Sequence, residues 1–146
     1  MKITTKYHGD VEINSEEILK FEKGIPGFQD EKGFILLPLS DDDIFYVMQS
    51  VSNGQIAFVL SNPFNFFREY DFKLEDSVVE EIELESEGDI LVYSILTVQN
   101  PFDKTTANLQ APVIINSKNR KGKQVILHNE QYSTKHPIFE NTEVKG

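Results

Sequence analysis

Apolar and polar residues alternate with a period of two along most of the chain. The segments 3–7 and 11–13 both show this alternation, and His8-Gly9-Asp10 between them reads as a turn. A period of two predicts strands with one buried face, whereas an amphipathic helix would repeat every 3.6 residues. The N-terminal segments are therefore expected to form two strands joined by a turn.

Three further apolar runs predict the body of a sheet, at residues 34–39, 44–51 and 56–60. The second and third runs are separated by Ser52-Asn53-Gly54. Asn-Gly between apolar runs is a strong hairpin signal, because both residues tolerate a positive φ. We therefore expect the second and third runs to pair as a hairpin.

Residues 90–98 are nearly all apolar and rich in β-formers. Such a run is typical of a central strand that is buried on both faces. Residues 111–115 and 124–127 predict two more strands, flanking a basic turn at 116–123. Pro112 inside the first of these runs indicates a bulge or an edge strand, and an open edge there could accept a strand from a partner.

One segment has helical spacing. Asp76 is a candidate N-cap for a helix over 77–84, with Val78, Val79 and Ile82 on one face. The alternation at 82–85 leaves a strand open as well. The pattern as a whole predicts a mainly β fold: a small antiparallel β-barrel-like single domain over residues 1–139, with at most one or two short helices and a frayed tail at 140–146.

Composition narrows the class of protein. The chain has 146 residues and no cysteine, which excludes disulfides, a thiolate nucleophile and cysteine-containing zinc sites. No signal peptide is readable after Met1, and no apolar stretch reaches the roughly 18 residues of a membrane helix. We expect a cytoplasmic protein without membrane contact.

Charge is unevenly distributed. The net charge is −10, which disfavours direct binding to nucleic acid. Residues 1–117 hold 8 Lys and Arg against 21 Asp and Glu, whereas residues 118–146 hold 6 against 3. No Lys or Arg lies between Lys73 and Lys104. The acidic residues in that interval are Glu75, Asp76, Glu80, Glu81, Glu83, Glu85, Glu87 and Asp89. Such a face suits a basic protein partner, or it serves only as a solvated surface.

Catalytic and metal motifs are not apparent. His8, His128 and His136 are not spaced as local metal ligands, and Asp41-Asp42-Asp43 lacks the alternation of a calcium loop. No phosphate-binding loop or nucleophile elbow is present. We expect no enzymatic activity, no cofactor and no metal.

Three turns carry phenylalanine beside proline. Their candidate contact residues are Pro26 and Phe28, Phe64 and Phe66, and Pro101 and Phe102. Exposed aromatic rings provide a large contact area at low entropic cost, so these turns are candidates for partner binding. The alternative is that the rings fold back and plug the ends of the barrel.

The ordered motifs resemble a known family. They are Phe21-x-x-Gly24-Ile25-Pro26-Gly27-Phe28, Asn62-Pro63-Phe64, the run 106–116 (TANLQAPVIIN), the run 122–127 (GKQVIL) and Tyr132. Together they resemble the flagellar assembly factor FliW family from about Ile3 to Phe139. Each motif alone is weak, and the ordered set is specific.

The resemblance implies a non-enzymatic regulator of flagellum assembly with a small β-barrel-like fold. FliW proteins bind CsrA, an RNA-binding translational repressor, and relieve its repression of flagellin messenger RNA. They also bind flagellin, which sequesters them. A monomer is expected when the protein is free. A flagellin-dedicated chaperone is the alternative, and a small β-barrel enzyme or ligand carrier ranks third.

Two further groups complete the candidate partner-binding residues. Asn108 and Asn116 bracket the signature strand, where capping of turns is an equally good role. Glu80, Glu83, Glu85 and Glu87 are the electrostatic candidates in the acidic interval.

Overall fold

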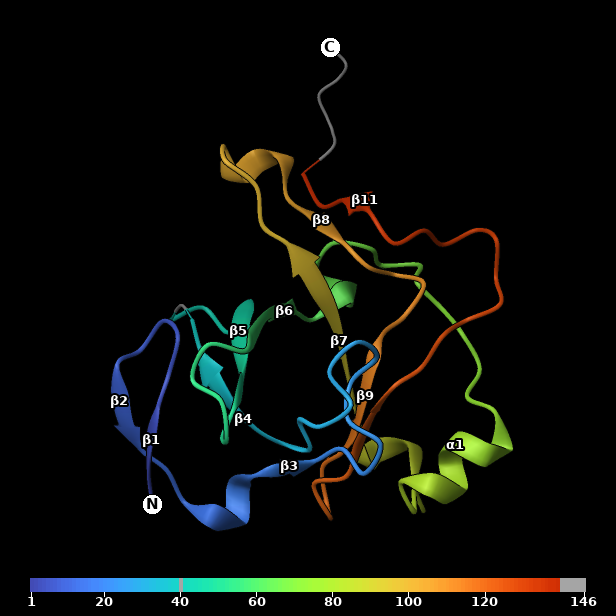
Figure 1. Ribbon diagram of the computed structural model, residues 1–146. Helices are drawn as coiled ribbons and strands as arrows, with labels where there is room; N and C mark the ends of the chain where they lie inside the picture. The colour runs from blue at the N-terminus through green and yellow to red at the C-terminus, as the bar shows by residue number, and fades with distance from the viewer. Residues whose placement is uncertain (40, 140–146) are drawn as a thin grey trace.

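A computed structural model describes residues 1–39 and 41–139, and the predicted tail at 140–146 lies outside the described residues. Two antiparallel sheets dominate these residues (Figure 1). The smaller is a hairpin of β1 (Lys2–Thr4) and β2 (Asp10–Glu12), which confirms the two strands predicted at the N-terminus.

The larger sheet has nine strands, seven of them in the order β10-β9-β7-β6-β5-β4-β3. Its strands are β3 (Leu19–Lys20), β4 (Gly33–Pro38), β5 (Phe45–Ser50), β6 (Ala57–Ser61), β7 (Ile90–Thr97), β8 (Thr106–Ala107), β9 (Val113–Asn116), β10 (Gly122–Gln124) and β11 (His136–Pro137). Strand β8 pairs with both β7 and β11.

Strand β7 is a central strand of the large sheet. It pairs with β6, β8 and β9, so the prediction of a central strand is confirmed. Its side chains alternate between two hydrophobic clusters: Val92 and Leu96 join one, and Tyr93 and Ile95 join the other. Burial on both faces is not complete, because Leu91 is 37% exposed.

The sheet curls without closing into a barrel. Strand β3 and the residue before β10 meet at one isolated parallel bridge, Lys20 with Lys121, where the Lys20 amide donates to the Arg120 carbonyl over 2.7 Å. Phe21 then packs directly on Gly122, where an added Cβ would lie 2.7 Å from the ring. A mainly β fold is confirmed, and the barrel-like description holds only in this loose sense because a single bridge is not a ladder.

The hairpin between β5 and β6 forms as predicted, although the turn residues adopt another geometry. Neither Asn53 nor Gly54 has a positive φ. Instead the buried Gln49 amide donates to carbonyls of the loop, including those of Gly54 and Ile56, at 3.2–3.3 Å. A side chain, rather than a two-residue turn, therefore shapes this connection.

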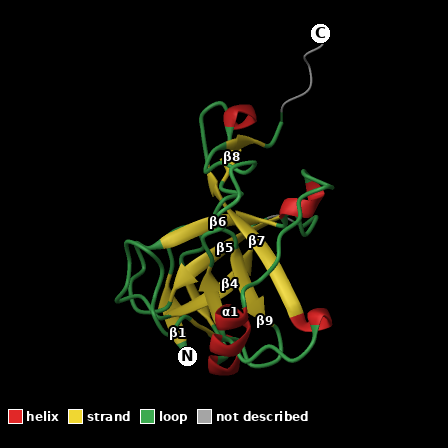
Figure 2. Cartoon of the chain, turned by 90° about the vertical axis from the view of Figure 1, so that its right-hand side faces the viewer, coloured by secondary structure: helices red, strands yellow, loops and turns green. Residues whose placement is uncertain are grey.

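Among residues 1–39 and 41–139, one α-helix, α1 (Asp76–Glu81), lies at the periphery of the strands, with four 3-10 turns also outside the sheet (Figure 2). The predicted helix is thus confirmed but shorter, and Glu75 occupies the N-cap position in place of Asp76. The helix stops because Glu83 takes a positive φ of 56°. The 3-10 turns are η1 (Ser15–Glu17), η2 (Pro63–Asn65), η3 (Glu87–Asp89) and η4 (Phe102–Lys104).

The predicted edge strand near Pro112 is wrong. Pro112 precedes β9, and its carbonyl accepts a hydrogen bond from the Val125 amide over 2.9 Å. Strand β9 has β7 on one side and β10 on the other, so it offers no open edge. The run predicted at 124–127 pairs earlier in the sequence, at 122–124, because Gly122 is opposite Ile115.

Candidate functional site

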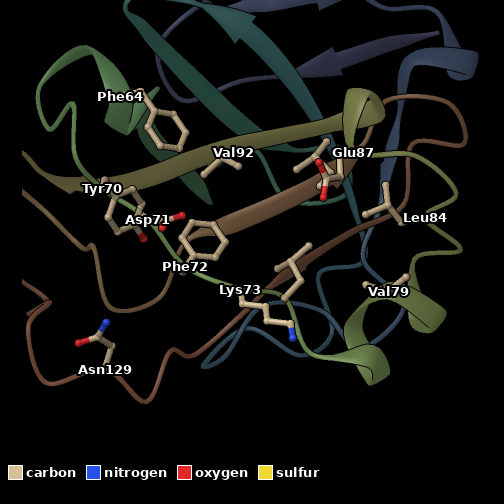
Figure 3. A pocket seen from close by; sticks show the side chains of 12 residues that line it. Phe64, Tyr70, Asp71, Phe72, Lys73, Val79, Leu84, Glu87, Val92 and Asn129 are labelled. Carbon is tan, nitrogen blue, oxygen red and sulfur yellow. The ribbon is translucent and has the colours of Figure 1, made fainter.

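An open pocket of about 760 Å³ lies on the α1 side of β7, and we call it the apolar groove (Figure 3). Its lining residues are Phe64, Tyr70, Asp71, Phe72, Lys73, Leu74, Val79, Leu84, Glu87, Ile90, Val92 and Asn129. Eight of these twelve side chains are aliphatic or aromatic, so the groove is an apolar surface with polar groups at its margins.

Phe64 borders the groove because of the local turn that carries it. The Asn62 side chain caps η2 by accepting the Phe64 amide over 2.9 Å, and Pro63 is buried at the first position of the turn. The Phe64 ring lies 5.8 Å from the Tyr70 ring and stays 41% exposed. This predicted contact residue therefore offers surface to a partner.

The wall opposite the helix is held by two tyrosines. The Tyr70 hydroxyl donates to the Leu109 carbonyl over 2.7 Å, and its ring lies edge-on to Tyr132 at 4.8 Å. The Tyr132 hydroxyl accepts the Asp71 amide and donates to the Asp71 carbonyl, both over 3.0 Å. Burial, and then the neighbouring Tyr132, raise the pKa of Tyr70, so its hydroxyl stays protonated and keeps its hydrogen bond to the Leu109 carbonyl.

The residues of this wall alternate between apolar and polar types along the sequence, a pattern that did not lead to a predicted element. Tyr70, Phe72 and Leu74 alternate with Asp71 and Lys73, as in a half-buried strand. The segment has no strand partner, and its apolar side chains line the groove instead. Alternation alone did not indicate which surface these side chains would form.

The acidic interval meets the basic turn in space. Lys121 pairs with Glu83 at 2.8 Å and with Glu22 at 3.1 Å, and Lys123 pairs with Glu81 at 3.3 Å. Hydrogen bonds first to Glu83 and then to Glu22 raise the pKa of Lys121. The charge separation along the sequence is therefore partly cancelled in the fold.

Not every acid of this interval is ion-paired, although Asp89 also contacts Lys118, at 4.0 Å. Glu80, Glu85 and Glu87 are exposed, and they make no ion pair within residues 1–39 and 41–139. Glu87 also lines the apolar groove. Of the four electrostatic candidates, Glu83 is thus engaged within the chain and the other three are available.

A second aromatic surface forms elsewhere, between the turns at η2 and η4. Phe66 lies 5.9 Å from Phe45, and Phe102 lies 5.6 Å from both Phe45 and Phe139. Phe66 and Phe139 close the ring of contacts at 5.9 Å. We call these four residues the aromatic tip. Phe102 is 43% exposed and Phe139 is 44% exposed, with the exposed Pro101 beside them.

The third aromatic turn joins neither surface through a ring contact. Phe28 stacks edge-on against Phe58 at 5.4 Å, while Pro26 borders a small cavity beside Lys23 and Lys123. The turn requires Gly24, which has a φ of +69° and leaves only 2.6 Å between an added Cβ and the Gln29 backbone. Phe66 and Phe102 thus share Phe45 and Phe139 as ring partners, whereas Phe28 packs on Phe58 and Phe64 on Tyr70.

Asn108 and Asn116 have structural roles. Asn116 is 2% exposed, and its amide donates to the carbonyls of Ile82 and Glu83 over 3.0 and 3.1 Å. The Asn108 side chain accepts the amides of Gln110 and Ala111 over 3.1 and 3.0 Å. Both side chains are occupied within the chain, so we do not place them in a partner interface.

Neither a metal cluster nor a membrane-spanning helix is found among residues 1–39 and 41–139. Within the described part of the chain, no three His, Asp or Glu side chains are arranged to hold a metal ion. Among those residues, no helix has the length and apolar character that crossing a bilayer requires.

Comparison with known proteins gives a consistent result. A family model described as FliW protein matches residues 2–138. The flagellar assembly factor FliW of Geobacillus kaustophilus (strain HTA426) is 53% identical over 139 residues, covering 95% of this chain and 96% of that protein. The protein of the same name from Bacillus subtilis (strain 168) is 50% identical, covering 94% and 96%. A crystal structure of the flagellar assembly factor FliW, 50% identical, superposes with a TM-score of 0.93 over 98% of this chain and 100% of that chain.

Proposed function

The chain belongs to the FliW family of flagellar assembly factors, and on that premise we propose that it acts by binding two proteins. It binds and antagonises the translational repressor CsrA, which relieves repression of flagellin translation. It is itself sequestered by flagellin. In this role the protein catalyses no reaction, needs no cofactor and works in the cytoplasm, where flagellin is translated.

The observation that best supports CsrA as a partner is the free acidic surface. Glu80, Glu85 and Glu87 are exposed without ion pairs among the described residues, in a chain with a net charge of −10. A repressor that binds RNA presents a basic surface, and an acidic protein is attracted to that surface. Once docked, the same carboxylates repel the phosphate backbone of the RNA.

Antagonism of this kind is reciprocal. If this protein lowers the affinity of CsrA for RNA by some factor, RNA must lower the affinity of CsrA for this protein by the same factor. A titration of RNA onto CsrA that leaves the affinity of this protein unchanged would contradict the antagonism.

A flagellin-dedicated chaperone is the second candidate. The aromatic tip favours it, because Phe102 and Phe139 expose apolar rings in a part of the chain that is not strongly acidic. Exposed aromatic groups of this kind are frequent at protein–protein contacts. In this candidate role, flagellin is the main partner and CsrA is not bound.

The test is a sizing column loaded with the purified chain and CsrA, with and without flagellin. Regulation through CsrA predicts a complex that flagellin dissociates. The chaperone role predicts a complex with flagellin alone. Failure of both partners to co-elute at micromolar concentration would overturn both candidates.

A further inference from the structure

We propose that the apolar groove binds an amphipathic α-helix of a partner protein, with apolar residues at i, i+3 or i+4, and i+7, and with Lys or Arg along both flanks. The proposal rests on the proposed function in one respect, namely that the chain acts by binding proteins. It adds the surface used and the secondary structure and charge of the bound segment.

The apolar lining allows the groove to bury apolar side chains of a partner. Its volume is about 760 Å³, and eight of its twelve lining side chains are aliphatic or aromatic. Phe64 is 41% exposed at one wall, and Val79 with Leu84 forms the facing wall (Figure 3). Burying such rings and aliphatic side chains against apolar anchors would provide the main favourable free energy of binding.

The floor of the groove favours a helix over an added strand. Ile90 and Val92 lie two residues apart on β7, so they point to the same face of the sheet. Over residues 90–93, one edge of β7 is hydrogen-bonded to β9, and the groove is lined by the side chains of Ile90 and Val92 on the face of the sheet. A sheet face offers side chains for packing, whereas strand addition needs free backbone groups at an edge. The helix is therefore the occupant that fits the floor.

The charges around the groove determine which charged residues the bound helix should carry along its flanks. Asp71 and Glu87 line the groove, and Glu80 and Glu85 lie in the adjoining acidic interval. Among the described residues that line the groove, Lys73 alone is basic. A helix with Lys or Arg beside its apolar stripe is complementary to this rim, and an acidic helix is repelled.

The polar lining residues do not converge as they would around a small molecule. Glu87 lies at one end of the groove and Asn129 at the other, with Lys73 at a third margin (Figure 3). Small-molecule sites use a few polar groups that aim at one ligand. A long occupant with polar flanks matches this scattered arrangement better.

The direct test titrates the full chain with a synthetic peptide of about 18 residues, in which Leu forms one helical stripe and Lys fills the remaining positions. A second peptide replaces Lys by Glu, and a third scrambles the Leu positions so that no stripe forms. The Lys peptide should shift the backbone amide resonances of residues 64, 70–74, 79–84 and 90–92. Its affinity should exceed that of either control peptide by about tenfold or more.

Two pairs of variants locate the binding. Phe64→Ala should weaken peptide binding about tenfold, whereas Phe102→Ala should not. The two rings are matched, because each follows a proline at a 3-10 turn and they are 41% and 43% exposed. Glu87→Gln should weaken binding more than Glu16→Gln, since both residues lie in the first turn of a 3-10 helix but only Glu87 lines the groove.

The outcomes separate this proposal from the proposed function. Equal binding of the scrambled peptide, shifts centred on the aromatic tip, or no binding of the Lys peptide overturns the groove proposal. If both CsrA and flagellin bind the Phe64→Ala variant with unchanged affinity, the groove proposal fails while the proposed function stands. If neither protein binds the unmodified chain, the proposed function fails, and the peptide titration still decides the groove.

Discussion

The Tyr70 side chain holds one wall of the apolar groove in place. Its hydroxyl donates to Leu109 while its ring contacts Phe64 on one side and Tyr132 on the other. The ring positions a wall of the apolar groove, and the hydrogen bond ties that wall to the loop before β9. A buried tyrosine whose hydroxyl must reach a hydrogen-bond acceptor is held in one position more strictly than a phenylalanine at the same site would be.

Replacement of Tyr70 by phenylalanine should lower the free energy of unfolding by about 1 kcal/mol at pH 7, because the Leu109 carbonyl loses its donor. The difference should shrink above about pH 10. There the unfolded tyrosine ionises while the raised pKa keeps the folded hydroxyl protonated, so the wild-type chain loses stability that the variant does not lose. Urea unfolding of the wild-type chain and the variant, at pH 7 and above about pH 10, measures the difference in their free energies of unfolding. A difference that is the same at both pH values would contradict this explanation.

The neighbouring residues Phe64 and Phe66 mark the limit of sequence-based prediction at this scale. Both were predicted as contact residues of one turn, yet Phe64 borders the groove and Phe66 joins the aromatic tip. Capping by Asn62 could be predicted from local sequence. The direction of each ring could not, because it depends on Tyr70 and Phe45, which lie elsewhere in the fold.

Among the elements, strands were predicted well where apolar runs were long. The runs at 34–39, 44–51 and 56–60 became β4, β5 and β6 with the expected hairpin. A period of two carries this information directly. The strand predicted at 124–127 was displaced to 122–124, since the register depends on the fit of Gly122 against Phe21, more than ninety residues away.

The sequence did not predict which elements of the candidate site lie next to each other in the fold. The acidic interval was predicted from composition, but its partial neutralisation by Lys121 and Lys123 was not. Ion pairs between residues about forty positions apart require the helix and the β9–β10 hairpin to be placed side by side. That placement is a property of the sheet order and not of either segment.

Asn116 joins those two elements. Substitution by alanine should lower the free energy of unfolding by about 2–3 kcal/mol, because it leaves the Glu83 carbonyl and the Lys118 amide without their partner. The Ile82 carbonyl loses one of its two donors and keeps the Asn119 side chain. Asn65→Ala, at an exposed position, should change it by less than about 0.5 kcal/mol. Chemical denaturation of both variants measures the effect. Equal, small changes would show that the contact is not needed.

At the scale of the whole molecule, the field of the net charge of −10 acts on partners before contact. The association rate with CsrA should fall about tenfold between roughly 50 and 500 mM salt. Glu85→Gln with Glu87→Gln should lower that rate more than Asp10→Asn with Glu16→Gln, although both pairs remove two charges. Stopped-flow mixing measures the rates, and identical losses would assign the effect to total charge and not to the acidic surface.

The single bridge between β3 and the residue before β10 has a consequence for biosynthesis. Phe21, near the beginning of the chain, is covered by Gly122, near its end. A polypeptide leaving the ribosome therefore holds this ring uncovered until the final hairpin has emerged. Completion of the hydrophobic interior therefore waits for the β9–β10 hairpin, about a hundred residues after Phe21, and until then the nascent chain exposes an apolar surface that the folded protein conceals.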